Sequence, residues 1–184
     1  SKENWGRPQE EIQMLFQLLS AGLEKELHHF KKHDIKLSFL GNLSALPPKI
    51  TKKLTHIHKQ LVHNKGLHLC IALNYSGRWQ ITEAAKKIAK DAVEGKIIPE
   101  NITEEKFATY LDCHHIPVPD PEILIRTGGE YRLSNFLLWQ LSYTEIFVLN
   151  IMWPEFSEKT LQSIIFAYQR RDRRFGRIES SLTN

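Results

Sequence analysis

Short apolar segments with the pattern of strands alternate along this chain with segments of helical periodicity, and this order limits the folds open to it. The expected strands are 35–40, 67–73, 123–125 and 147–150. Strands separated by helices pair in parallel, because the helix carries the chain back to the end of the sheet where the previous strand began. The sequence therefore predicts an α/β fold with a central, mostly parallel sheet flanked by helices.

The expected helices differ in the apolar surface that they carry. They are 8–32, 47–64, 79–93, 103–111, 135–141 and 157–173. In the first helix, Met14, Phe16 and Leu18 widen an apolar stripe of helical spacing, so we expect this helix to be buried on more than one side. Ser134 stands directly before the helix 135–141, where its hydroxyl can cap the helix.

Length and composition are those of an ordinary folded domain. Of the 184 residues, 41% are apolar and 25% are charged, which excludes a disordered, collagen-like or coiled-coil chain. A chain of this length buries roughly 70% of the surface that it exposes when unfolded, so it needs no disulfide or structural metal to fold. We therefore expect a single domain over 1–184.

The net charge of +4 is unevenly placed. The segment 169–177 holds five Arg against one Asp. Two interpretations of this segment stay open. Cations at the end of a helix suit the helix dipole, whereas clustered Arg can also bind phosphate, nucleic acid or an acidic membrane surface.

The cysteines and the hydropathy bear on location. Cys70 and Cys113 form no CxxC or disulfide pattern, which predicts a reducing compartment. The longest apolar stretch, 146–153, is too short to span a bilayer, and no signal peptide is visible. We expect a cytoplasmic protein and leave peripheral contact with a membrane open.

Several groups that can carry chemistry have a simpler interpretation. The histidines at 28–29, 56, 58 and 114–115 lack the spacing of zinc sites and are expected on the surface or in loops. Nothing nearby orients Cys113 and His114 as nucleophile and base, so we expect a neutral thiol. Three aromatic side chains favour a core or a dimer interface over stacking on nucleic-acid bases: Phe136, Trp139 and Phe147.

Polar residues follow two of the expected strands, namely 74–78 after the strand 67–73 and 126–135 after the strand 123–125. Ligands bind at this position in parallel α/β folds. After 123–125 come Arg126, Arg132 and Ser134, with two glycines that let the backbone turn tightly. Two guanidinium groups and a hydroxyl at a helix start make a diphosphate clamp. The alternative is a structural ion pair through Glu130 with the second Arg in solvent.

Five segments carry a resemblance to a known family. They are SKENWGRP at 1–8, ALNYSGR at 72–78, IRTGGEYRLSNFLLWQ at 125–140, WPEF at 153–156 and RRFG at 173–176. In this order the chain resembles the cis-prenyltransferase family, most closely the bacterial undecaprenyl diphosphate synthases. The resemblance covers essentially the whole chain.

The resemblance implies a reaction and roles for particular residues. The family uses Mg²⁺ to condense isopentenyl diphosphate repeatedly onto an allylic diphosphate, usually farnesyl diphosphate, and makes a polyprenyl carrier lipid for cell-wall synthesis. It implies that Arg126, Arg132 and Ser134 hold isopentenyl diphosphate and that Glu145 helps to bind Mg²⁺. It also places a mobile loop that shapes substrate binding and catalysis at the counterparts of Ser1, Asn4, Trp5 and Arg7, with Asn4 and Arg7 as catalytic residues.

The resemblance further implies a homodimer, in which the segment 174–176 reaches toward the partner's active site. An apolar tunnel must hold the growing product, and the first helix and the strand 67–73 are candidate walls, although both can equally be ordinary core. A nucleic-acid-binding domain is disfavoured, because the interleaved aromatic and basic surface pattern of such domains is missing.

One part of the family pattern is not in this sequence. The family begins with a strand and helix and an Asp-Gly-Asn-Gly-Arg loop whose Asp is the key catalytic and Mg²⁺-binding residue, whereas the turn 74–78 has no carboxylate. We expect the chain to be part of a longer polypeptide, with Ser1 inside the mobile loop. The alternative function is a non-catalytic partner subunit of a heteromeric cis-prenyltransferase, although the Arg126–Ser134 clamp favours the enzyme.

Overall fold

The computed structural model describes residues 1–116 and 119–171, and the chain divides into two compact units. The first unit comprises 1–116 with 134–139, and the second comprises 119–133 with 140–171. The helices and strands of the first unit are α1 (Gln9–Lys32), β1 (Lys36–Leu40), α2 (Pro48–Leu61), β2 (His68–Ala72), α3 (Gly77–Val93) and α4 (Glu104–Ala108). Those of the second are β3 (Ile123–Thr127), β4 (Glu145–Leu149) and α5 (Glu158–Gln169). The single-domain organisation stays a prediction.

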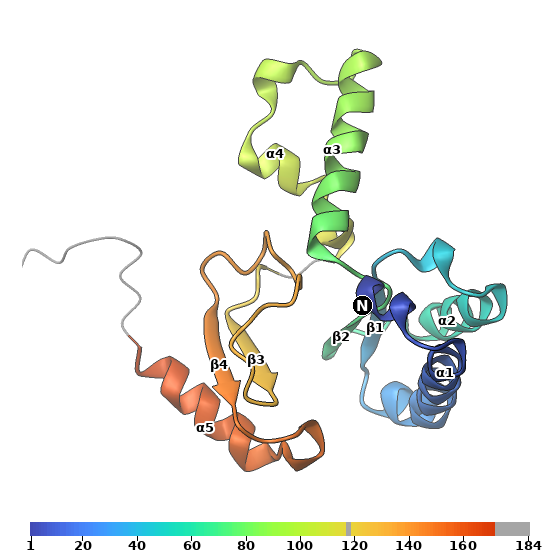
Figure 1. Ribbon diagram of the computed structural model, residues 1–184, viewed down its shortest axis with the longest axis vertical. Helices are drawn as coiled ribbons and strands as arrows, with labels where there is room; N and C mark the ends of the chain where they lie inside the picture. The colour runs from blue at the N-terminus through green and yellow to red at the C-terminus, as the bar shows by residue number, and fades with distance from the viewer. Residues whose placement is uncertain (117–118, 172–184) are drawn as a thin grey trace, which may run out of the picture. The chain divides into compact units, whose positions relative to one another are not determined.

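In the first unit β1 and β2 pair in parallel, from Lys36 opposite His68 to Leu40 opposite Ala72. α1 and α2 lie against each other beside this pair (Figure 1). The core between them is apolar, and Leu37, Ile57 and Leu61 are at most 1% exposed. The parallel pairing confirms the α/β prediction for this part of the chain.

The broad burial expected for α1 is wrong. Met14 is 61% exposed and Leu18 64% exposed, whereas Leu23 is buried. Since successive helical residues are about 100° apart, Met14 stands on the opposite side of the helix from Leu23. The face that packs on the core is a single stripe with these members: Phe16, Leu19, Leu23, Leu27 and Phe30.

The helix expected at 135–141 does not form, so Ser134 caps no helix there. The backbone φ is +48° at Ser134, +62° at Asn135 and +43° at Leu137, a left-handed conformation that an α-helix excludes. The segment instead folds as turns against the start of α3. Asn135 accepts a hydrogen bond from the Gly77 N–H at 2.7 Å, and a Cβ on Gly77 would lie 2.7 Å from Leu138 Cγ. Position 77 therefore requires glycine.

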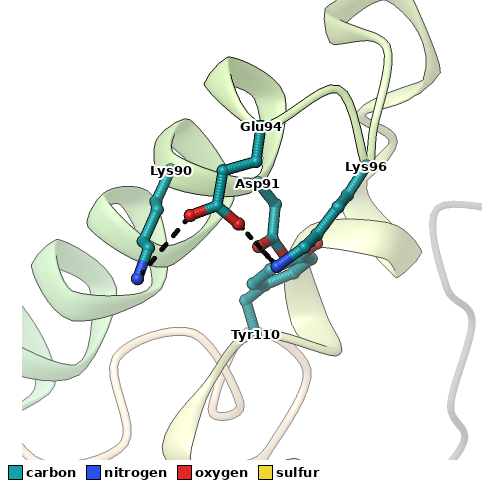
Figure 2. Close-up of polar contacts among 5 residues, drawn as sticks. All are labelled: Lys90, Asp91, Glu94, Lys96 and Tyr110. Atoms are coloured by element: carbon teal, nitrogen blue, oxygen red, sulfur yellow. Dashed lines mark hydrogen bonds and ion pairs between the residues drawn. The ribbon is translucent and has the colours of Figure 1, made fainter.

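A polar network joins the end of α3 to the region of α4 (Figure 2). Tyr110 donates its hydroxyl to Asp91 at 2.8 Å. Lys96 lies 3.5 Å from Asp91 and 2.6 Å from Glu94, and Lys90 completes the network 3.8 Å from Glu94. The hydrogen bond from Tyr110 and the charge of Lys96 lower the pKa of the Asp91 carboxyl, against a smaller opposing effect of burial. The network therefore favours ionised Asp91.

In the second unit β3 and β4 also pair in parallel, from Ile123 opposite Glu145 to Thr127 opposite Leu149. α5 begins after Ser157, whose hydroxyl accepts the Thr160 N–H at 3.3 Å. α5 ends at Gln169, before the expected end at 173, which lies outside the described residues. Both strand pairs are parallel, as the sequence predicts. Only β1 and β2 have a helix, α2, between them in the chain, whereas turns alone connect β3 to β4.

Leu61→Ala tests the core of the first unit. The side chain is fully buried, so we expect the free energy of unfolding to fall by about 2–5 kcal/mol through lost burial and a residual cavity. Urea unfolding of the two proteins measures this difference. Leu18→Ala, at an exposed leucine of α1, is the matched control and should cost less than about 0.5 kcal/mol. Equal losses would contradict the assignment of the core.

Tyr110→Phe tests the polar network of Figure 2. Without the hydroxyl, the pKa of Asp91 should rise toward its ordinary value, as NMR titration of the Asp91 carboxyl can measure. Because the folded-state pKa is lowered, the stabilisation from Asp91 is present above the unfolded-state pKa and is lost as the pH falls through the folded-state pKa. Tyr131→Phe, at an exposed tyrosine of the second unit, should leave the titration of Asp91 unchanged.

Candidate active site

The first candidate region is the short 3-10 helix Lys2–Gly6, which docks on the turn after β2. The Lys2 N–H donates to the carbonyl of Tyr75 at 3.0 Å. The Trp5 indole N–H donates to Asn74 Oδ1 at 2.6 Å, and Asn74 Nδ2 donates to the carbonyl of Asn42 at 2.9 Å. Asn74 is buried, with φ at +49°. The orientation of the Trp5 indole is therefore set by a residue outside its own segment.

The other predicted residues of this segment contact partners that are close to them in sequence. Ser1 donates its hydroxyl to Asn4 Oδ1 at 3.1 Å. Arg7 forms an ion pair with Glu11 of α1 at 2.6 Å, and both side chains are about half exposed. The structure thus brings Ser1, Asn4 and Trp5 together, while Arg7 is held at the start of α1.

A mainly apolar cavity of about 190 Å³ opens beside this segment. Its polar lining comes from Ser1, Asn4 and Asn74, and the Trp5 ring lies 5.9 Å from that of Phe16. The apolar lining comes from both elements that were expected as tunnel walls: Ile12, Leu15, Phe16 and Leu19 of α1, and Ala72 and Leu73 at the end of β2. The cavity suits an apolar ligand with a polar end.

Two ionisable side chains, Cys70 in β2 and Tyr75 in the turn after it, stay neutral near neutral pH. Tyr75 is 3% exposed, donates its hydroxyl to Gln80 Oε1 at 2.8 Å, and burial raises the pKa of its phenol far above the ordinary value. Burial likewise raises the pKa of the Cys70 thiol to about 11. Cys113 packs on the same apolar cluster as Cys70. Neither Tyr75 nor Cys70 is an acid or nucleophile near neutral pH.

The second candidate region belongs to the second unit and contains both arginines of the predicted clamp. Arg126 lies at the carboxyl end of β3, where it pairs with Val148, and its guanidinium donates to the main-chain oxygen of Arg132. Arg132 forms an ion pair with Glu130 at 2.5 Å. These three residues line a cavity of about 370 Å³ together with Leu124, Tyr131, Leu133, Ile146 and Val148.

The turn between the two arginines depends on glycine. Gly128 and Gly129 have φ of +90° and +70°, and a Cβ on Gly129 would lie 3.0 Å from Asn150 Oδ1. The ion pair weighed as the alternative to a clamp is thus present, between Glu130 and Arg132, in the same cavity as Arg126. Ser134, the third predicted member, belongs to the first unit.

Glu145, the predicted metal ligand, begins β4 and has its carboxylate paired with Arg171. The Arg171 guanidinium also lies 4.8 Å from the centre of the Phe147 ring. Among the described residues there is no cluster of three or more His, Cys, Asp or Glu side chains that could hold a metal. A lone carboxylate fits Mg²⁺ only where substrate phosphates supply further oxygens. Glu145 stands at the amino end of β4, opposite Ile123, and is not among the residues that line the cavity of Arg126 and Arg132.

Asn74 and Asn135 belong to the two polar segments after strands, but neither was predicted as a site residue. Both hold the N-terminal segment through side-chain hydrogen bonds. Their positions after a buried strand and within a turn were the available signal, since Asn tolerates left-handed backbone. The predicted segment 174–176 lies outside the described residues. In the part of the chain that the structure covers, no helix combines the length and hydropathy needed to cross a membrane.

The chain is similar to known proteins of one family. The family model described as "Putative undecaprenyl diphosphate synthase" matches residues 1–176. An isoprenyl transferase of Chlorobaculum tepidum is 42% identical over 182 residues, which are 99% of this chain and 68% of the relative. A ditrans,polycis-undecaprenyl-diphosphate synthase, (2E,6E)-farnesyl-diphosphate specific, of Wigglesworthia glossinidia brevipalpis is 42% identical over 180 residues, which are 98% and 68% of the two chains.

A solved structure is also similar. The crystal structure of lavandulyl diphosphate synthase from Lavandula x intermedia, in complex with dimethylallyl diphosphate, has a TM-score of 0.91 and 34% identity. The match covers 95% of this chain and 75% of that one. With a family model that matches nearly the whole length and relatives above 40% identity, the chain belongs to the cis-prenyltransferase family of the undecaprenyl diphosphate synthases.

Proposed function

We propose that this chain is the larger part of a Mg²⁺-dependent cis-prenyltransferase that condenses isopentenyl diphosphate onto an allylic diphosphate. Farnesyl diphosphate is the proposed primer, and the product is a long-chain polyprenyl diphosphate that serves as a carrier lipid for cell-wall synthesis. The observation that carries the proposal is the pair Arg126 and Arg132, which line one cavity at the carboxyl end of β3.

The chemistry of this cavity suits a diphosphate with a small apolar group. Two guanidinium groups provide forked N–H donors that match phosphate oxygens. The apolar lining of Leu124, Ile146 and Val148 is adjacent to them. Isopentenyl diphosphate has this composition, a polyanionic diphosphate head and five carbons, and we assign Arg126, Arg132 and Ser134 to its binding.

The cavity beside α1 suits the other substrate. Its walls are apolar, and Ser1, Asn4 and Trp5 lie at one side, so the prenyl chain of an allylic diphosphate fits there. The names of the relatives support this class of substrate, because one is specific for farnesyl diphosphate and another was crystallised with dimethylallyl diphosphate. We assign Ser1, Trp5 and Arg7 to substrate binding, and Asn4 and Arg7 to catalysis.

The reaction asks the protein mainly to orient two substrates and to stabilise the departing diphosphate. When bound, Mg²⁺ would neutralise diphosphate charge, with Glu145 as its protein ligand in this chain. Arg126 and Arg132 orient isopentenyl diphosphate through its head, and the apolar walls keep water from the reacting carbons. These 184 residues do not include the family's Asp-containing loop. We propose that the carboxylate of that loop completes the active site together with Glu145.

The protein's assembly and location are part of the proposal. We assign it to a homodimer in the cytoplasm, with peripheral contact to the membrane that receives its lipid product. The arginines assigned above, Arg7, Arg126 and Arg132, act on diphosphate. No nucleic acid is expected as a partner. In the alternative, a non-catalytic subunit, these residues would serve a complex with a second, catalytic chain.

Arg126→Ala tests the proposed function. In the polypeptide that contains these residues, the KM for isopentenyl diphosphate should rise about 10–100-fold, the effect of losing a charge-assisted contact of about 1.5–3 kcal/mol. Incorporation of labelled isopentenyl diphosphate into polyprenyl product measures this, and EDTA should stop it.

Lys87→Ala, at an exposed position of α3, is the control and should leave the KM unchanged. Absence of Mg²⁺-dependent incorporation by the intact polypeptide would refute the catalytic function. Incorporation that begins only when a second, different subunit is added would favour the alternative.

A further inference from the structure

Asn135 lies where three separate stretches of the first unit meet. Its Nδ2 donates to Glu3 Oε1 at 2.7 Å and to Ser76 Oγ at 2.7 Å. Its Oδ1 accepts the Arg78 N–H at 2.9 Å, and its main-chain oxygen accepts the Gly77 N–H at 2.7 Å. Both amide hydrogens and the amide oxygen are therefore used.

The position accepts few other residues. The backbone φ of +62° disfavours side chains other than Asn, Asp and Gly. Asp has no amide hydrogens to donate, and it would set a second carboxylate against Glu3. Gly has no side chain to reach either partner. Asparagine alone combines this backbone conformation with two donors and one acceptor.

The bond to Glu3 is charge-assisted. The Asn135 amide is the main cause that lowers the pKa of the Glu3 carboxyl, which agrees with an ionised acceptor near neutral pH. Glu3 directly precedes Asn4 and belongs to the 3-10 helix that carries Trp5. Asn135 thus reaches the segment whose Asn4 and Trp5 line the apolar cavity.

Asn135 also directly follows Ser134, which we assign to isopentenyl diphosphate. We propose that Asn135 is a positioning residue that couples the loop at Ser134 to the segment 1–7, so that isopentenyl diphosphate at Ser134 orders the segment beside the prenyl cavity. This inference rests on the proposed function for the identity of the ligand. Any movement of the peptide at 134–135 changes the geometry of the bond to Glu3, and the coupling acts in both directions.

The segment keeps other anchors, so loss of Asn135 should uncouple it rather than release it. Lys2 still bonds Tyr75, and Trp5 still bonds Asn74. These bonds are independent of Ser134, since they join the segment to the turn after β2. The predicted defect is therefore in the response to ligand, with the docking of the segment largely retained.

Hydrogen exchange with mass spectrometry, on the polypeptide with and without saturating isopentenyl diphosphate and Mg²⁺, tests the coupling. In the unchanged protein the ligand should slow exchange in 121–133 and, by about fivefold or more, in 1–7. In Asn135→Asp the protection of 121–133 should remain, while that of 1–7 is lost. Asn64→Asp is the matched control, because Asn64 also donates its amide to main-chain oxygens, at Phe30 and Ile35, and it should keep both protections.

Glu3→Ala is the second variant, since it removes the other partner at an exposed position and leaves the core intact. It should abolish the ligand-dependent protection of the segment as Asn135→Asp does, and Glu3→Gln, which keeps an oxygen acceptor, should restore part of it. Protection of 121–133 without protection of 1–7 in the unchanged protein would overturn the coupling alone. Absence of protection in 121–133 would instead count against the proposed substrate.

Discussion

The turn that follows β2 can form only because two backbones approach each other closely at the end of the β1–β2 pair. Gly41 follows β1 with φ of +116°, and a Cβ there would lie 2.2 Å from the carbonyl oxygen of Leu73. The approach is held by the Leu73 N–H, which donates to the carbonyl of Leu40 at 2.8 Å, and by the Gly41 N–H, which donates to Asp112 at 2.7 Å. It sets Asn74 within reach of Asn42 and Trp5. A larger residue at position 41 would displace the turn on which the N-terminal segment docks.

In the proposed function, the two cavities divide the chemistry that isoprenoid diphosphates require. The cavity beside α1 is lined mainly by aliphatic and aromatic side chains, whereas that of the second unit contains two guanidinium groups and one carboxylate. A net charge of +4 is modest for the whole chain, and what matters chemically is the placement of single arginines. A chain that bound nucleic acid through its charge would instead need a basic surface spread over many phosphates.

The parts of the fold that local pattern determines could be predicted from the sequence. The strands, their parallel pairing and the helices α2, α3 and α5 follow from apolar runs, period and caps. The segment 135–141 could not be predicted, because its apolar residues have helical spacing while tertiary hydrogen bonds decide its conformation. Asn135 accepts one from the Gly77 N–H and donates others to Ser76 and Glu3. The exposure of Met14 could not be predicted either, because a wide apolar stripe does not indicate which of its sides packs against another element.

The candidate site, like the fold, could be predicted only where local sequence pattern determines it. Arg126 and Arg132 follow a buried strand and could be paired on that basis, but the Arg171 partner of Glu145 is distant in sequence and carries no motif. Asn74 and Asn135 owe their roles to left-handed backbone and to partners more than 50 residues away, with sequence separations of 69 for Asn74–Trp5 and 132 for Asn135–Glu3. Single-residue properties do not reveal such pairs.

Three charged residues of the candidate site have a partner of opposite charge within the chain. Arg132 is paired with Glu130, Arg7 with Glu11 and Glu145 with Arg171. Arg132 and Glu130 are 63% and 47% exposed, and exposed pairs of this kind contribute only about 0–1 kcal/mol. A diphosphate, with more charge and more acceptor oxygens than one carboxylate, can therefore replace Glu130 at small cost. In the proposed function, Glu130 holds Arg132 in place before isopentenyl diphosphate binds, and the weakness of this exposed pair lets the diphosphate take over the same N–H donors.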